Sequence, residues 1–322
     1  MTITKFLAKL RTESPKSLCR KIFRRTVTAI SRAFTKLRTH VSWPVYSRIK
    51  GWKGVTTKNY GRELIISLTT YPPRIHIVHV AIRTLLMQDM KPNRVILWLA
   101  KEDFPNREKD FPAELLDLQR FGLEFGWSDN FRSHTKLIPA LKAFPEADIV
   151  NADDDIYYRP DWLSTLYAEH MRHPEDICAH RITKFYVDES GNFEAEGGGY
   201  NPYPCPSYLH KVTGVGGVIY PPHSFYKDIT DANIFMNICT TNDDIWFWLM
   251  AVLNHVKVRV TKGNYFHLAL AVVGDTQKGP TLMSINDQGE KLFWKDFYRM
   301  LEHYPELDGI LREEYQRMKK GA

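Results

Sequence analysis

The chain of 322 residues has only four cysteines, and no two of them form a Cys-x-x-Cys pair. So few and widely separated cysteines are typical of proteins in a reducing compartment, and they predict neither a disulfide framework nor a zinc site. The sequence also lacks an apolar run of the roughly 20 residues that a membrane-spanning helix needs, and it lacks the compact apolar segment of a signal peptide. With 43% hydrophobic residues, the chain can instead bury a substantial core, in one large α/β domain or two smaller ones.

Acidic residues are nearly absent from the first 50 positions. Residues 1–50 contain 13 lysines and arginines but one acidic residue, Glu13, whereas the rest of the chain has 31 basic and 36 acidic side chains. The net charge of +7 therefore comes from the N-terminal segment, and the body is mildly acidic. This asymmetry predicts a basic attachment segment joined to a separate working domain.

The basic segment has the periodicity of an amphipathic helix from about Ser17 to His40. Its apolar residues recur at alternating intervals of four and three and form one helical face: Phe23, Val27, Ile30, Phe34 and Leu37. A helix with such a stripe and many cationic side chains is typical of segments that bind an anionic membrane surface, where each basic residue contributes about 1 kcal/mol. The alternatives are a helix that packs its stripe on the body and a nucleic-acid-binding arm. The absence of Tyr and Trp before Trp43 argues against nucleic acid.

Strand-like and helix-like patterns alternate from residue 62 to about residue 170. Compact apolar runs predict strands, and apolar spacings of three and four predict helices. The expected strands are Leu64–Leu68, Arg94–Leu99, Leu123–Phe125 and Ile149–Val150, and the expected helices are Val78–Gln88, Ala113–Arg120, Thr135–Phe144 and Pro160–Glu169. This alternation indicates an α/β fold with a Rossmann-related, mostly parallel sheet that helices cover on both faces. Ligands of such sheets bind at the carboxyl ends of the strands.

Three consecutive aspartates follow the expected strand at Ile149–Val150. Two carboxylates about 4 Å apart repel by roughly 4 kcal/mol near a protein surface, so Asp153, Asp154 and Asp155 call for a cation or a donor-rich ligand among them. Side chains alternate along extended backbone. Asp153 and Asp155 are therefore expected to point to one side as ligands of Mg²⁺ or Mn²⁺, and Asp154 to the other. The plain alternative is a solvated acidic turn that caps the next helix.

The second half of the chain has a different pattern. Short strand-like runs at Ile177–His180, Lys184–Val187 and Val215–Tyr220 stand among glycines and prolines. They predict an irregular sheet region with loops suited to a second substrate. A helix is expected over Asn242–Leu253, with two aspartates at its start.

The order of these features resembles the GT-A fold glycosyltransferases, most closely the bacterial family-2-like enzymes of surface polysaccharide biosynthesis. The resemblance covers roughly residues 62–270. It rests on the opening strand Leu64–Tyr71, the helix–strand pair Ala81–Leu99, the acidic segment Asp148–Trp162, the glycine-rich segment Val212–Val218 and the later Asp243-Asp244 pair. This chain has Asp-Asp where the family commonly has Glu-Asp, which leaves open which member acts as the base.

The resemblance implies a nucleotide-sugar donor whose diphosphate is bridged by Mn²⁺ or Mg²⁺ to the acidic motif. A cation held by carboxylates would stabilise the leaving diphosphate, so the chemistry agrees. Asp155 is the first choice as metal ligand, and Asp153 is expected to share the metal or to bind the ribose. An inverting transfer to a glycan or lipid-linked acceptor needs a carboxylate base. Asp244, or otherwise Asp243, is expected to supply it, and a plain helix cap is the alternative for either residue.

Four further residues are candidates for the donor site. Thr69, Tyr71 and Arg74 follow the first strand and are expected to hold the nucleotide base and phosphates; a proline-ordered surface turn is the alternative. Lys136 is expected to pair with the diphosphate, and a solvated helix lysine is the equally weighted alternative.

A histidine and two glycines complete the candidate site. His267 is a further possible metal ligand, although a lone histidine beside apolar residues is more often structural. Gly216 and Gly217 would let the backbone approach the sugar closely, and tight strand packing explains them nearly as well.

The sequence thus predicts the basic segment 1–50, a GT-A-like domain 62–270 and a C-terminal helical extension 271–322. Within the domain, residues 62–165 form the nucleotide-sugar half and residues 170–270 the acceptor half. The expected protein is a metal-dependent glycosyltransferase of the hexosyltransferase type, cytoplasmic and peripheral on the inner membrane face. A metal-dependent phosphohydrolase and a non-catalytic scaffold with a transferase-like fold are the alternatives.

Overall fold

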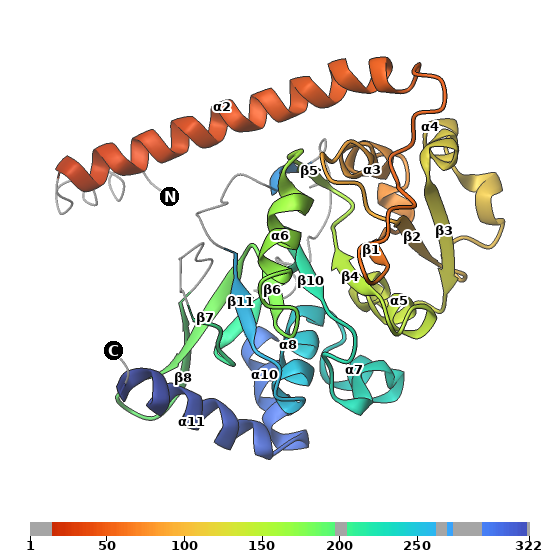
Figure 1. Cartoon of the computed structure of the whole chain (residues 1–322). Coiled ribbons are helices and arrows are strands. Elements are labelled where there is room, and N and C mark those ends of the chain that lie inside the picture. Colours follow the sequence, from red (N-terminus) through yellow and green to blue (C-terminus); the bar gives the residue numbers. More distant parts are fainter. Residues whose placement is uncertain (1–14, 197–204, 262–268, 273–291, 321–322) are drawn as a thin grey trace.

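A seven-stranded sheet in the order β11-β6-β10-β4-β1-β2-β3 forms the centre of the molecule (Figure 1). The computed structural model describes residues 15–196, 205–261, 269–272 and 292–320. The sheet strands are β1 (Leu64–Thr69), β2 (Arg94–Ala100), β3 (Leu123–Ser128), β4 (Asp148–Asn151), β6 (Ile177–Ala179), β10 (Val218–Tyr220) and β11 (Val258–Val260). Neighbours from β4 through β1 and β2 to β3 are parallel, as are β6 and β11, whereas β10 is antiparallel to both of its neighbours. The predicted α/β class with a mostly parallel sheet is confirmed.

Both faces of the sheet are buried, which explains the continuous apolar runs of its strands. Along β1, Ile65 packs into one core together with Leu249, whereas Ile66 packs into the opposite core together with Ile82. The helices of the body are α3 (Val78–Leu86), α4 (Ala113–Leu116), α5 (Ile138–Ala143), α6 (Trp162–His170), α7 (Ala232–Ile238), α8 (Asp243–Leu253), α10 (Leu292–His303) and α11 (Glu306–Lys320). Short 3₁₀ turns join them at η1 (Pro72–Arg74), η2 (Arg107–Asp110), η3 (Asp117–Phe121), η4 (Arg132–Lys136), η5 (Gly214–Gly216) and η6 (Lys227–Thr230).

The expected elements of the first half are present, with two differences in the helices. The helix expected over Thr135–Phe144 begins only at Ile138, because Pro139 fits the first turn of a helix but not its interior, and η4 occupies the preceding residues. The helix expected over Ala113–Arg120 divides into α4 and the tighter turn η3.

Two smaller sheets stand beside the central one. Strands β7 (Ile182–Val187), β8 (Phe193–Glu196) and β9 (His210–Val212) form an antiparallel sheet in the region where irregular strands were expected. Strand β5 (Ile156–Tyr158) pairs with β12 (Ala269–Val272). Because β5 begins directly after the three aspartates, this small sheet borders the carboxyl edge of the central sheet.

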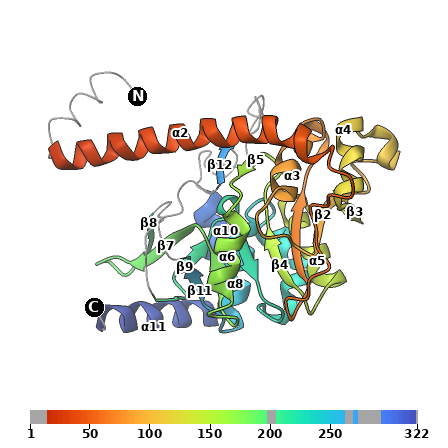
Figure 2. The same cartoon turned by 45° about the horizontal axis from the view of Figure 1, so that its top comes forward.

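The basic segment contains one long helix, α2 (Pro15–Tyr46), whose C-terminal half lies over β12, β5 and α3 (Figure 2). One face of this half is buried and includes Thr35, Thr39 and Trp43. The predicted apolar stripe lies on the exposed face instead: Phe23, Val27, Ile30, Phe34 and Leu37 are 69, 38, 64, 65 and 63% exposed. The stripe therefore does not pack on the body. Within the described residues, no helix is long and apolar enough to cross a bilayer.

Candidate functional site

The three aspartates form a turn between β4 and β5 at the carboxyl edge of the central sheet. We call Asp153, Asp154 and Asp155 the acidic turn. Asp154 and Asp155 share one partner, since Arg74 Nη1 lies 2.7 Å from Asp154 Oδ1 and 3.0 Å from Asp155 Oδ2. Asp153 pairs instead with Lys136. The expectation that Asp153 and Asp155 face one side and Asp154 the other is wrong, because the backbone turns here rather than continuing as extended strand.

The loop after β1 holds the acidic turn from one side. The Thr70 hydroxyl donates to Asp154 Oδ2 at 2.6 Å, and Arg74 in η1 provides the shared guanidinium. The Arg74 guanidinium also lies 5.5 Å from the ring centre of Tyr71, which is 44% exposed. The Thr69 hydroxyl donates to the carbonyl of Trp98 at 2.9 Å. Of the three loop residues predicted for the donor site, Tyr71 thus presents the most open side chain and Arg74 is bound to the carboxylates.

Lys136 links the acidic turn to the start of α8. Its Nζ lies 2.8 Å from Asp243 Oδ2 and 3.5 Å from Asp153 Oδ1, and the side chain is buried. Burial alone would lower the pKa of Lys136, but the carboxylates of Asp243, Asp153 and Asp244 outweigh it and raise that pKa well above its usual value. The alternative of a solvated helix lysine is therefore wrong, because Lys136 is buried between carboxylates.

The two aspartates at the start of α8 have different surroundings. Burial raises the pKa of Asp243, but the charges of Lys136 and His134 outweigh it and lower the pKa below its usual value. The side chain of Asp243 is 9% exposed, whereas that of Asp244 is 26% exposed. Asp244 accepts the Gly214 backbone N–H at 3.1 Å and lies 3.8 Å from Lys211 Nζ. Asn242 occupies the N-cap position of α8, and both aspartates lie in its first turn, where carboxylates also interact favourably with the helix dipole.

The glycine-rich segment is fixed by close packing. A Cβ atom at Gly214 would lie 2.8 Å from Lys136 Nζ and 3.0 Å from Asp244 Oδ1, so a side chain there would displace the end of Lys136. Gly217 has a φ of +97°, and a Cβ atom there would meet the Trp162 ring at 2.5 Å. At Gly216 a Cβ atom would lie 2.7 Å from Arg181 Cβ. Tight packing thus accounts for Gly216 and Gly217 without a sugar.

Several residues of the site were not predicted from the sequence. Lys211 in β9 is the partner of Asp244, and no local pattern marks it, because only the tertiary fold brings β9 beside α8. Buried polar atoms without a protein hydrogen-bond partner occur in several parts of the described residues, and at this edge they include those of Asn151 at the end of β4, Thr213 and Tyr220.

The excess of carboxylates at the site suits a divalent cation, and no three of these carboxylates place oxygen atoms within 4.8 Å of one another in the described residues. Five carboxylates, those of the acidic turn with Asp243 and Asp244, share three protein cations through ion pairs, which leaves an excess of two negative charges. The remaining repulsion is evident at Asp155, whose pKa is raised to about 6 by burial and by the neighbouring Asp154 and Asp153 carboxylates. Oxygen ligands with this excess of charge suit Mg²⁺ or Mn²⁺. The predicted ligand His267 lies outside the described residues.

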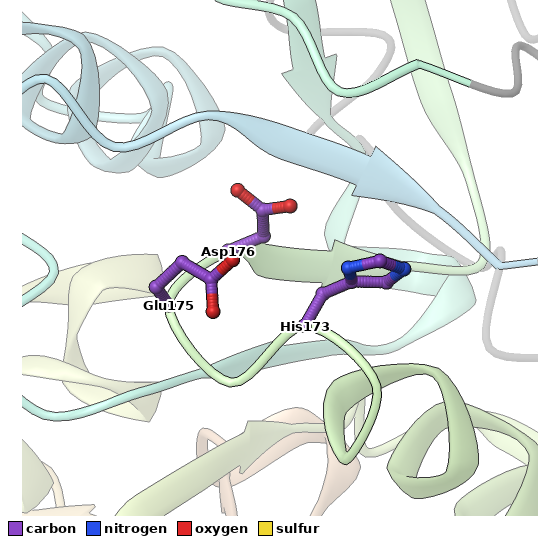
Figure 3. Close-up of side chains that lie close together, drawn as sticks. All are labelled: His173, Glu175 and Asp176. Carbon is purple, nitrogen blue, oxygen red and sulfur yellow. The ribbon is translucent and has the colours of Figure 1, made fainter.

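A second group of possible ligands lies at the opposite edge of the sheet. His173, Glu175 and Asp176 are the one set of three ligand atoms within 4.8 Å of one another in the part of the chain that the structure describes (Figure 3). They precede β6, which runs in the same direction as β4, so they lie at the amino edge. The Asp176 carboxylate points toward β11, where Arg259 Nη2 is 2.8 Å away. We do not assign a metal to this group, because exposed acidic groups such as Glu175 are common without one.

Replacing Asp155 by asparagine is expected to stabilise the metal-free protein at neutral pH. The folded pKa of about 6 lies above the ordinary value of 3.8, so ionised Asp155 costs stability above about pH 6, and this cost disappears as the pH falls toward 4. The Asp155→Asn variant should therefore gain up to about 3 kcal/mol at about pH 8 and converge with the wild type near pH 4. Urea unfolding without divalent ions measures this. A variant that is less stable at every pH would contradict it.

No protein-family model and no curated protein matches the chain. Among solved structures, it is similar to a CMP:2-keto-3-deoxy-manno-octonic acid synthetase complexed with CTP, at 16% identity over 62% of this chain and 88% of that one, with a TM-score of 0.36. It is similar to S. aureus TarS 1–349 in complex with UDP, at 14% identity over 62% and 58% of the two chains, with a TM-score of 0.38. The mannosyltransferase PcManGT from Pyrobaculum calidifontis, in complex with GDP-Man and Mn²⁺, has 13% identity over 48% and 46%, with a TM-score of 0.30. These neighbours are nucleotidyltransferases and glycosyltransferases, but likenesses of this size carry no argument about activity.

Proposed function

We propose that the protein is a metal-dependent glycosyltransferase that uses a nucleotide-sugar donor. The observation that carries this proposal is the excess of two negative charges where the acidic turn meets the start of α8. Five clustered carboxylates repel one another and are costly to keep unless a ligand needs them. A divalent cation fits this excess, and its natural co-ligand is a diphosphate.

Each residue of the site has a role in such a transfer. Asp155 and Asp153 would hold the cation, which would supply Lewis-acid stabilisation of the departing diphosphate. Arg74 and Tyr71 stand beside the acidic turn, where phosphate and base would lie. The acceptor oxygen attacks the anomeric carbon, the bond from that carbon to the diphosphate oxygen breaks, and Asp244 takes the acceptor's hydroxyl proton. In this inverting mechanism Asp244 is the general base, and the role of Asp243 is to hold Lys136 in place.

The two alternatives have less support. A two-metal phosphohydrolase needs two adjacent sets of metal ligands, and in the described residues no three ligand atoms at this edge of the sheet lie within 4.8 Å of one another. A non-catalytic scaffold would not need a carboxylate such as Asp155, whose raised pKa shows that its ionised form is disfavoured in the fold.

Mn²⁺ together with a nucleoside diphosphate is expected to raise the melting temperature. Binding to the folded state at 100 times the dissociation constant stabilises it by about 2.7 kcal/mol, which corresponds to several degrees. UDP, GDP, CDP and dTDP are each tested with and without Mn²⁺ in a thermal melt. Asp155→Ala should lose the response, whereas Asp129→Ala, which removes an exposed carboxylate paired with Lys101, should keep it. No response to any of the four nucleotides would refute the donor site.

The attachment partner in this proposal is an anionic membrane surface at the inner, cytoplasmic face, and the acceptor is a glycan or a lipid-linked sugar. The support is the outward position of the α2 stripe, which includes Phe34 and Leu37, in a segment with 13 basic residues and one acidic residue. An exposed apolar stripe with nearby cations suits the interface of an anionic bilayer. The Phe34→Glu/Leu37→Glu double variant is expected to lose flotation with anionic vesicles.

A further inference from the structure

Two exposed side chains beside the buried face of α2 reach the strand that follows the acidic turn. His40 Nε2 lies 3.1 Å from the Tyr157 hydroxyl, and Lys36 Nζ lies 5.7 Å from the centre of the same ring. Tyr157 is the middle residue of β5, which is only three residues long and begins directly after Asp155. The opposite side of Tyr157 packs on Val80 and Ala81 of α3. Tyr157 is therefore held between α2 and the body.

The next residue of β5 fixes the acidic turn itself. The backbone N–H of Asp153 donates to the hydroxyl of Tyr158 at 2.7 Å, and this tyrosine is fully buried. Tyr157 and Tyr158 point to opposite sides of the strand, as neighbours in extended backbone do. His40 is thus connected to Asp153 by its contact with Tyr157, by the backbone between Tyr157 and Tyr158, and by the hydrogen bond of Tyr158.

The outer face of the same part of α2 is free to meet a membrane. Phe34, Leu37 and Val41 are 65, 63 and 59% exposed, and they bracket His40 along the helix. A helix with its side chains is about 10 Å across, so a bilayer that binds this stripe lies roughly one helix diameter from Tyr157. The helix that carries the stripe therefore contacts β5 through His40 and Tyr157, and the acidic turn is joined directly to the start of the same strand.

We propose that membrane binding by α2 strengthens binding of the metal–nucleotide at the acidic turn, through the contact of His40 with Tyr157. This inference rests on the proposed function and adds its regulation. The N-terminal half of α2 extends beyond β12 (Figure 2), and the side chains of α2 that are buried among the described ones lie in its C-terminal half. Binding the stripe to a surface restrains α2, and with it β5. The acidic turn is then restrained before the ligand binds, so ligand binding loses less conformational entropy.

The test measures the dissociation constant of the Mn²⁺ complex of whichever nucleoside diphosphate binds, with no vesicles, with phosphatidylcholine vesicles, and with vesicles that also contain phosphatidylglycerol. Anionic vesicles should lower the constant at least about fivefold, the lower end of typical couplings between sites. By reciprocity, the nucleotide should tighten vesicle binding by the same factor. Hydrogen exchange of residues 152–158 should slow when the vesicles bind.

Three variants separate the steps of this proposal. Phe34→Glu/Leu37→Glu should bind the nucleotide as the wild type does in solution and show no effect of vesicles. Tyr157→Phe, which removes the hydroxyl at His40, should bind vesicles but lose the gain in nucleotide affinity. Tyr298→Phe, at an exposed tyrosine of α10, should keep the full gain.

Several outcomes would overturn the inference. The inference is wrong if the wild-type protein binds anionic vesicles without a change in nucleotide affinity. It is also wrong if the wild type does not bind the vesicles, or if the Tyr157→Phe variant keeps the gain in nucleotide affinity. Failure of the proposed function is a separate result, because it appears as a lack of nucleotide binding in the vesicle-free arm.

Discussion

Replacing Lys136 by methionine is expected to destabilise the protein by about 3–5 kcal/mol and to abolish the response to Mn²⁺ and nucleotide. Methionine keeps most of the volume of lysine, so the effect comes from charge rather than from a cavity. Lys136 is the partner that holds Asp243 and Asp153. Its loss leaves these buried carboxylates without a cation, and breaking a buried ion pair from one side costs this much.

The pH dependence of this loss distinguishes charge from packing. In the Lys136→Met variant, Asp243 loses the cation that lowers its pKa, while the burial that raises the pKa stays. Its folded pKa should then lie above the unfolded value, so the penalty is present at neutral pH and is lost as the pH falls and the carboxyl becomes protonated. Urea unfolding at a series of pH values measures this recovery.

Lys142 provides the matched control, since it is an exposed lysine on the adjoining helix α5. The Lys142→Met variant should stay within about 0.5 kcal/mol of the wild type, as surface substitutions usually do. A Lys136→Met variant with wild-type stability and an intact nucleotide response would show that Lys136 does not balance these carboxylates.

Local patterns in the sequence were sufficient for the elements that carry the site. The run Leu64–Leu68 predicted β1 because a strand buried on both faces needs continuous apolar residues, and Asp243 begins α8 as expected. These features depend on neighbours in the chain. The edge of the sheet on which ligands collect follows from the same alternation of strands and helices.

The pairing of charges could not be predicted in this way. Asp153 and Asp155 were assigned to one side by the alternation of extended backbone, but the chain turns there, and the partners that separate them come from η1 and η4. Lys211 and the antiparallel direction of β10 likewise depend on contacts between segments distant in sequence. The outward direction of the α2 stripe also needed the structure, because an amphipathic pattern does not tell which partner the apolar face meets.

Replacing Asp244 by asparagine is expected to lower kcat for sugar transfer by about 10²–10⁴-fold, the usual contribution of a general base. Asparagine keeps an oxygen that accepts the Gly214 N–H but cannot take a proton from the acceptor. Because this side chain is 26% exposed, keeps its bond to Gly214 and lies 3.8 Å from Lys211 Nζ, stability should fall by less than in Asp243→Asn. Binding of Mn²⁺ and nucleotide should stay close to that of the wild type.

The neighbouring aspartate provides the contrast that assigns the base. Asp243→Asn removes the closest carboxylate of buried Lys136, so its main expected effect is on stability, again by about 3 kcal/mol or more. Turnover of nucleotide sugars with Mn²⁺, together with urea unfolding, measures both variants. If Asp243→Asn is stable and inactive while Asp244→Asn turns over normally, the roles are reversed. The two exposures favour Asp244, because a base must reach the acceptor hydroxyl, and of the pair Asp243 is the one enclosed with the lysine.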